Sequence, residues 1–168
     1  AVPRQYSPAV EAGARDFLRR GPLGFPVVDI SVTLVDGAYH NVDSSEMAFK
    51  TAGRMAMSEG LPKCSPVLLE PILEVRIAAP SDHTAKVNAL ISGRRGQILG
   101  FEPREGWVGW DEVSANLPQS EVHDLIVELR SLSAGAGSYT WKFDHLQELT
   151  GRLADDVVSS RKAALESA

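Results

Sequence analysis

The chain has 168 residues, of which 43% are hydrophobic and 23% charged, with 14 glycines and 10 prolines. This balance is typical of folded globular domains and excludes disordered, collagen-like and disulfide-rich chains. Lys and Arg number 17 against 22 Asp and Glu, so the formal net charge is -5. That charge excludes a protein whose whole surface is basic and binds nucleic acid.

Residues 1–65 predict a helix, a strand and a second helix. A Ser-Pro pair at 7–8 is typical of a helix start, and apolar spacing extends that helix over 8–20. Strict alternation of apolar and polar residues over 27–35 predicts a half-buried strand. Residues 43–46 have the N-cap and N3 acid of a capping box, which predicts that the second helix begins there.

One strand cannot form a sheet, so the alternating face of 27–35 needs partner strands from elsewhere. The sequence also begins with Ala1-Val2-Pro3 and lacks an initiator methionine. We therefore expect the chain to be the C-terminal piece of a longer protein. The break in pattern at 61–66 is the best candidate for a domain boundary.

Residues 66–145 predict an α+β domain with the element order β-α-β-β-α-β. The expected elements are strand 73–77, helix 82–92, strands 97–102 and 111–117, helix 119–132 and strand 138–143. This order is the split βαβ signature of a ferredoxin-like sandwich, in which two helices cover one antiparallel sheet. The tail, residues 146–168, predicts a terminal helix that packs loosely or frays after about 160.

Catalytic motifs are absent from the sequence. It has no phosphate-binding G-x-x-x-x-G-K-[ST] loop, no dinucleotide fingerprint, no H-E-x-x-H and no G-x-S-x-G. Its four histidines lie far apart, and the lone Cys64 supports neither a zinc site nor an internal disulfide. We expect no catalytic or metal site here. Without a signal segment or membrane span, we expect a cytoplasmic protein.

A polar loop between the predicted strand and second helix is one candidate contact site. It displays Tyr39, His40 and Asn41 in succession, more residues than a simple strand-to-helix connection needs. The helix behind it points its positive N-terminal end at the loop, which suits a phosphate backbone. The alternative is that Tyr39 packs and Asn41 caps a turn.

A Gly-flanked arginine pair, Arg94 and Arg95, is the second candidate. Guanidinium groups bind phosphate with paired donors, and flanking glycines allow a close backbone approach. The alternative is a left-handed helix cap with two solvated arginines beside the helix C-terminus.

Four longer segments resemble the C-terminal domains of translation elongation factor G. They are GFPVVDI at 24–30, DGAYHNVDSSEMAF at 36–49, PVLLEPI at 66–72 and RRGQI at 94–98. They occur in the family's order, and the resemblance extends from about Val2 to Phe143. It implies that 1–65 is the second half of domain IV and that 66–145 is the ferredoxin-like domain V.

The resemblance also implies a function. In this family an N-terminal GTPase domain, which would hold GTP and Mg outside this fragment, hydrolyses GTP on the ribosome. Domain IV enters the small-subunit decoding region and helps to move tRNA and mRNA. The family's RNA-contacting tip loop corresponds to Gly37, Ala38, Tyr39, His40 and Asn41.

Domain V in this family lies near the GTPase-associated region of large-subunit ribosomal RNA. The resemblance makes Arg94 and Arg95 the candidate contacts there. The sequence departs from the translocating factors at 119–125 and at 135–137, where it is similar to the elongation factor G-like paralogues. Two alternatives stay open: a tetracycline-resistance ribosomal protection protein, and a stand-alone ferredoxin-like module that binds a small ligand.

Overall fold

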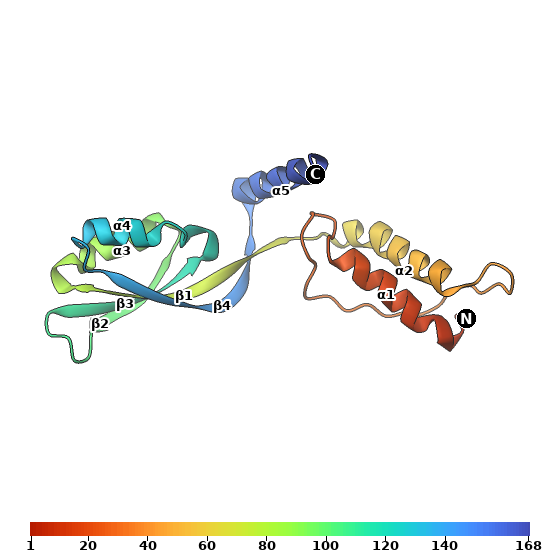
Figure 1. The fold of residues 1–168 in the computed structure, drawn as a ribbon, viewed down its shortest axis with the longest axis horizontal. Coiled ribbons are helices and arrows are strands. Elements are labelled where there is room, and N and C mark those ends of the chain that lie inside the picture. The colour runs from red at the N-terminus through yellow and green to blue at the C-terminus, as the bar shows by residue number, and fades with distance from the viewer. The chain divides into compact units, whose positions relative to one another are not determined.

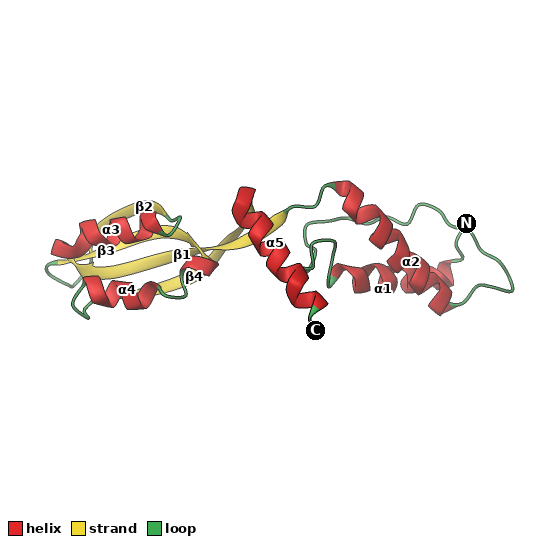
Figure 2. Ribbon diagram, turned by 90° about the horizontal axis from the view of Figure 1, so that it is seen from above, coloured by secondary structure: helices red, strands yellow, loops and turns green.

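The computed structural model describes residues 1–168, which form two compact units. The helical unit consists of Ala1–Leu68 together with Thr150–Ala168, and the sheet unit consists of Leu69–Leu149. Figures 1 and 2 show the helices of the first unit and the helix-covered sheet of the second. None of the helices is both long and apolar enough to span a bilayer.

Three α-helices make up most of the helical unit. They are α1 (Ser7–Leu18), α2 (Glu46–Gly60) and α5 (Gly151–Glu166), with short 3-10 turns at Arg4–Tyr6 and Leu61–Cys64. Pro8 lies in the first turn of α1, as the sequence predicts. The cap of α2 is Ser45, whose Oγ accepts a hydrogen bond from the Ala48 N–H at 3.1 Å. Glu46 is therefore the first helical residue, and the expected capping box with Glu46 at N3 is wrong.

Helices α1 and α2 pack with their backbones in close contact at two glycines. A Cβ on Gly13 would lie 1.9 Å from the carbonyl oxygen of Lys50, and one on Gly53 would lie 2.5 Å from that of Val10. No side chain fits in either place, so the two glycines set how closely the helices approach. Phe49 is buried in α2 beside this crossing.

The strand predicted over 27–35 is not formed. These residues are irregular, and the side chains of its apolar face remain substantially exposed. They are Val28 at 49%, Ile30 at 40%, Val32 at 54% and Leu34 at 45%. The physical reason is that the helical unit contains no other strand, so the backbone groups of this segment have no ladder to join.

The sheet unit is the predicted ferredoxin-like sandwich. Its four strands have the order β2-β3-β1-β4, and α3 (Thr84–Gly93) and α4 (Leu125–Leu132) lie on one face (Figures 1 and 2). The strands are β1 (Leu68–Pro80), β2 (Gln97–Pro103), β3 (Trp110–Pro118) and β4 (Ser138–Leu149). β3 pairs antiparallel with both β1 and β2.

The core of this unit lies between the helices and the inward face of β1 and β3. Its most buried large side chains come from strands and helices alike: Val75, Ile77, Val87, Ile91, Val113, Leu117, Leu125 and Leu129. Burying an aliphatic side chain of this size contributes about 1.5–3 kcal/mol. The alternating residues of β1 and the helical spacing in α3 and α4 thus meet in one core.

Several element ends differ from the prediction. The helix expected over 119–132 begins as a 3-10 turn at Gln119–Glu121, and α4 itself starts at Leu125. β4 continues to Leu149, beyond the expected 143, so the terminal helix starts at Gly151 instead of 146.

The terminal helix, expected to pack loosely or to fray after about 160, runs to Glu166 and has no buried residue. The Arg161 Nε–H donates to the Gly24 carbonyl at 2.8 Å, and its guanidinium lies 5.4 Å from the Phe25 ring centroid. These contacts join the last turns of α5 to the loop after α1, and the helix continues to Glu166.

Candidate RNA-contact sites

The tip loop, residues 37–41, is shaped by hydrogen bonds from its own backbone. The Gly37 N–H donates to Asp36 Oδ1 at 2.8 Å, and the His40 N–H donates to Ser44 Oγ at 3.0 Å. The Val42 N–H approaches His40 Nδ1 at 3.4 Å, and that nitrogen lies 3.5 Å from Asp43 Oδ2. These contacts link the loop to residues 42–44, just before α2, and place the imidazole beside Asp43.

A ladder of aromatic rings fixes the base of the tip loop. Tyr39 stacks against Tyr6 with ring centroids 6.1 Å apart, and Tyr6 stacks against Phe49 at 4.6 Å. Tyr39 therefore packs, as the structural alternative proposed, yet it keeps 43% of its surface exposed. Gly37 is also confined, because a Cβ there would lie 2.4 Å from Val2 Cγ2.

His40 and Asn41 are the side chains that the loop presents to solvent. Both are exposed, and the His40 side chain is 71% accessible. No Lys or Arg occurs anywhere in residues 21–49, whereas Asp36, Asp43 and Glu46 surround the tip. Such a loop suits bases and sugars, which it reaches by hydrogen bonding and stacking, better than the phosphate backbone.

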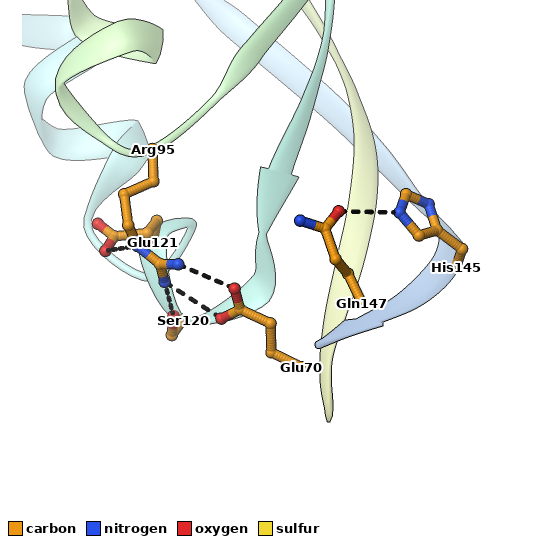
Figure 3. A network of polar contacts seen from close by, with 6 residues as sticks. All are labelled: Glu70, Arg95, Ser120, Glu121, His145 and Gln147. Carbon is orange, nitrogen blue, oxygen red and sulfur yellow. Dashed lines mark hydrogen bonds and ion pairs between the residues drawn. The ribbon is translucent and has the colours of Figure 1, made fainter. Parts of the chain in front are cut away.

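The arginine pair lies in the turn after α3, and neither guanidinium is free (Figure 3 shows Arg95). Arg94 donates to the Glu121 carbonyl and pairs with Glu128 Oε1 at 2.6 Å, and its side chain is only 12% exposed. Arg95 binds both carboxylate oxygens of Glu70, at 2.8 and 3.1 Å.

Further contacts complete the Arg95 cluster. Its Nε lies 3.3 Å from Glu121 Oε1 and its Nη2 lies 3.4 Å from Ser120 Oγ (Figure 3). The hydrogen bonds to Glu70, and then those to Glu121, raise the pKa of Arg95 above its usual range. The guanidinium is thus held as a cation among carboxylates, and a phosphate would have to displace one of them.

The backbone at the arginine pair forms the left-handed helix cap of the alternative interpretation, but an arginine takes the left-handed conformation. Arg95, not a glycine, has the left-handed φ of 57°, and the Gly96 N–H donates to the Ile91 carbonyl at 3.0 Å. Gly96 is needed for space, since a Cβ would lie 2.5 Å from Ile91 Cγ2. The arginines are ion-paired, so the expectation that they are solvated is wrong.

Sequence reasoning missed the carboxylates that hold this pair. Glu70 lies in β1, while Glu121 and Glu128 belong to the segment after β3, so only the fold brings them to the turn. Ser120 and Glu121 of this cluster belong to the segment 119–125, which the sequence analysis singled out on other grounds.

The histidines do not gather. His145 in β4 contacts its neighbours only, with Nδ1 2.6 Å from Asp144 Oδ2 and Nε2 3.3 Å from Gln147 Oε1 (Figure 3 shows His145 and Gln147). The hydrogen bond with Asp144 is the main cause that raises the pKa of His145 above its ordinary value. No three His, Cys, Asp or Glu side chains are placed to hold a metal ion.

The chain combines a helical unit, which carries an aromatic-anchored polar loop, with a ferredoxin-like sandwich. The family described as elongation factor G, domain IV, matches residues 1–65, and elongation factor G C-terminus matches residues 67–157. The chain therefore belongs to the elongation factor G family.

Two known proteins are similar to most of this chain. An elongation factor G-like protein of Synechocystis sp. is 58% identical over 156 residues, which are 93% of this chain and 23% of that protein. A crystal structure of a Thermus thermophilus protein matches with a TM-score of 0.87 and 36% identity, over 96% of this chain and 24% of that one. The chain thus spans about a quarter of the length of these relatives.

Proposed function

We propose that this chain is the ribosome-contacting C-terminal region of an elongation factor G-like translational GTPase. The observation that carries the proposal is the tip loop, which an aromatic ladder anchors while His40 and Asn41 stay exposed. The match of residues 1–65 to domain IV of elongation factor G supports it. The identity to an elongation factor G-like protein favours this role over ribosomal protection or small-ligand binding.

GTP and Mg belong, in this proposal, to a GTPase domain outside the chain, and the chain itself performs no chemistry. Its part is to carry a rigid polar tip into RNA of the small-subunit decoding region, beside tRNA and mRNA. His40 and Asn41 offer hydrogen bonds to base edges and 2′-hydroxyl groups, and Tyr39 offers a partly exposed ring for stacking.

Rigidity matters because a loop that is already ordered loses little entropy when it binds. The Tyr6–Tyr39 stack and the Ser44 hydrogen bond to the His40 backbone supply that order here. Helices α1 and α2, which contact each other closely at two glycines, support the aromatic ladder. Tip residues are therefore expected to act through position and donor geometry.

The sheet unit supplies the second proposed contact, with RNA of the large-subunit GTPase-associated region. Arg94 is mostly covered, so Arg95, with 33% of its side chain exposed, is the better placed of the two. A phosphate would compete there with Glu70 and Glu121. We expect this contact with phosphate to be weaker than one made by an arginine that forms no ion pair.

The test is His40→Ala in the full-length protein, with His123→Ala as the matched control. His123 is 90% exposed and lies in the sheet unit, outside both proposed contacts. We expect single-turnover translocation to slow about tenfold in His40→Ala, as the loss of one well-placed hydrogen bond implies. GTP hydrolysis on the ribosome should stay unchanged, since the change leaves the GTPase domain intact.

An unaltered translocation rate in His40→Ala contradicts the role of the tip, and an equal loss in His123→Ala shows that the effect is not specific. For the sheet unit, Arg95→Gln should weaken ribosome binding and flatten its dependence on salt. A salt slope equal to that of the parent protein contradicts the phosphate contact.

A further inference from the structure

The hairpin tip, residues 102–111, comprises the loop between β2 and β3 and the adjoining ends of both strands, and it carries an aromatic cluster that the proposed function does not use. Trp107 and Trp110 lie edge to face with ring centroids 5.0 Å apart, and the Arg104 guanidinium lies 4.2 Å from the Trp107 centroid. Trp107 is 48% exposed, and Val108 at the apex is 102% exposed. Trp and Arg are the residues most enriched where proteins bind each other tightly.

The backbone holds this cluster in one shape. Gly106 and Gly109 have φ of 75° and 77°, the left-handed conformations that tight turns require. The Arg104 N–H donates to the Trp110 carbonyl at 2.8 Å, and the Ser81 N–H donates to the Gly109 carbonyl at 2.9 Å. The tip is thus tied to the end of β1, and little ordering remains to be done when a partner binds.

A surface pocket of about 350 Å³ opens among these side chains. Its walls combine aromatic, aliphatic and charged groups, including Ser81, Arg104, Trp107, Val108, Trp110 and Asp111. A single side chain of a partner fits a hollow of this size, and the exposed Val108 beside it adds apolar contact area.

Charge indicates what kind of partner fits. Five carboxylates of the sheet unit form ion pairs with Arg or Lys: Glu70, Glu74, Glu112, Glu121 and Glu128. Those without such a pair are Asp82, Asp124 and Asp144, which approach histidines, and Glu102, Glu105, Asp111 and Glu148. Glu102, Glu105 and Asp111 lie in the hairpin tip, where Arg104 is the only basic residue and already lies over Trp107. The exposed aromatic cluster is therefore surrounded by carboxylates that no Arg or Lys pairs with.

We propose that the hairpin tip is a docking site for a lysine- and arginine-rich segment of a protein component of the ribosome. An apolar or cationic side chain of that segment occupies the pocket beside Trp107, and its neighbouring cations pair with Glu102 and Glu105. The inference rests on the proposed ribosomal function and adds a protein contact to its RNA contacts.

RNA is the less suitable occupant of the same surface. Stacking on Trp107 alone would attract a base, but the attached phosphates would approach Glu102, Glu105 and Asp111. Like charges at an interface weaken binding and exclude wrong partners. A cationic polypeptide gains from the same carboxylates, so the charge pattern decides between the two.

The experiment places a genetically encoded diazirine amino acid at position 108 of the full-length protein. Val108 is fully exposed, so the change leaves the fold intact. The labelled protein is sedimented with purified ribosomes, irradiated, and the linked molecule identified by mass spectrometry. The same diazirine at position 141 is the matched control, because Trp141 is 58% exposed in β4, outside the hairpin.

We expect position 108 to link to a ribosomal protein within a segment rich in Lys and Arg. Trp107→Ala and Glu105→Lys, each added to the labelled protein, should lower the yield about tenfold. Trp141→Ala should leave the yield unchanged, and thermal unfolding by circular dichroism confirms that each variant is folded.

Links to ribosomal RNA, links to an acidic or neutral protein segment, or no link while the protein still sediments with ribosomes overturn this inference alone. Failure to sediment with ribosomes at all overturns the proposed function, and the inference with it. The two failures are thus distinguished in one experiment.

Discussion

The helical unit and the sheet unit both contain a run of alternating apolar and polar residues, but only the sheet unit forms a strand from it. Alternating apolar residues over 27–35 predict a strand, as they do over 73–77. In the sheet unit the signal lies inside β1, whose Leu73, Val75 and Ile77 are buried between sheet and helices. In the helical unit it forms no strand, and its apolar side chains stay exposed. Alternation thus specifies a strand only where another strand completes the ladder.

The two units also differ in how their cores are packed. The sheet unit interlocks large aliphatic side chains around Leu125 and Leu129. The helical unit brings two helix backbones together at Gly13 and Gly53, where no side chain fits. The first kind of core is damaged by removing atoms and the second by adding them.

Amide hydrogen exchange should show the largest contrast. Amides of 28–34 have no ladder partners in the 168-residue chain, so we expect them to exchange within seconds. Amides at the centre of β1 should exchange on the order of 10³-fold more slowly, since only global opening exposes them. Partner strands from a longer protein would slow the first group, and equal protection of both segments in this chain would contradict the comparison.

Leu129→Ala should produce the largest change from a single substitution. Leu129 is fully buried in α4, and removing its methyl groups leaves a cavity that costs about 2–5 kcal/mol of unfolding free energy. Urea unfolding followed by tryptophan emission measures it, because all three tryptophans lie in the sheet unit. Val127→Ala, at a 65% exposed position of the same helix, is the control and should change stability little.

Gly13→Ala should destabilise the helical unit by about 1–3 kcal/mol, the usual cost of overpacking. The added methyl would lie 1.9 Å from the Lys50 carbonyl oxygen, and backbone cannot easily move aside. Far-UV circular dichroism should report the change while tryptophan emission does not. Gly60→Ala is the control, because a Cβ there meets nothing within 4 Å; a similar loss in both variants would contradict the crossing.

The smallest effect concerns His145. Its pKa is raised mainly by the hydrogen bond with Asp144, so its protonated form is favoured in the folded chain. This contribution to stability is complete below the ordinary pKa of histidine and is lost as the pH rises through the higher folded value. NMR titration should show the pKa of His145 falling toward 6.5 in Asp144→Asn; an unchanged value would contradict the assigned cause.

Most of the sheet unit could be predicted from the sequence because its signals are local. The core positions of β1 and α3 follow periods of two and of about three and a half residues, and the composition of 103–106 indicates the loop that follows β2. The limits of 119–132 were less predictable. The segment starts as a 3-10 turn at Gln119–Glu121, directly after β3 ends at Pro118.

In the candidate sites, too, some features could be predicted from the sequence and others could not. The loop at 37–41 was recognisable because a polar aromatic-imidazole-amide run is unusual between two elements. That Tyr39 stacks on Tyr6 was not recognisable, since the two residues are far apart in the sequence and only the folded helical unit brings them together. Arg94 and Arg95 were recognisable as candidates, but their carboxylate partners were not.

The sequence by itself determined the β-α-β-β-α-β order, the family resemblance and the residues that the tip loop displays. Each of these depends on residues that are neighbours in the chain. The tertiary structure alone decided that 27–35 forms no strand, that Arg95 is held by Glu70, and that Trp107 stands exposed among unpaired carboxylates. Those outcomes depend on which distant groups meet, and pairing, burial and charge compensation are settled only when the chain has folded.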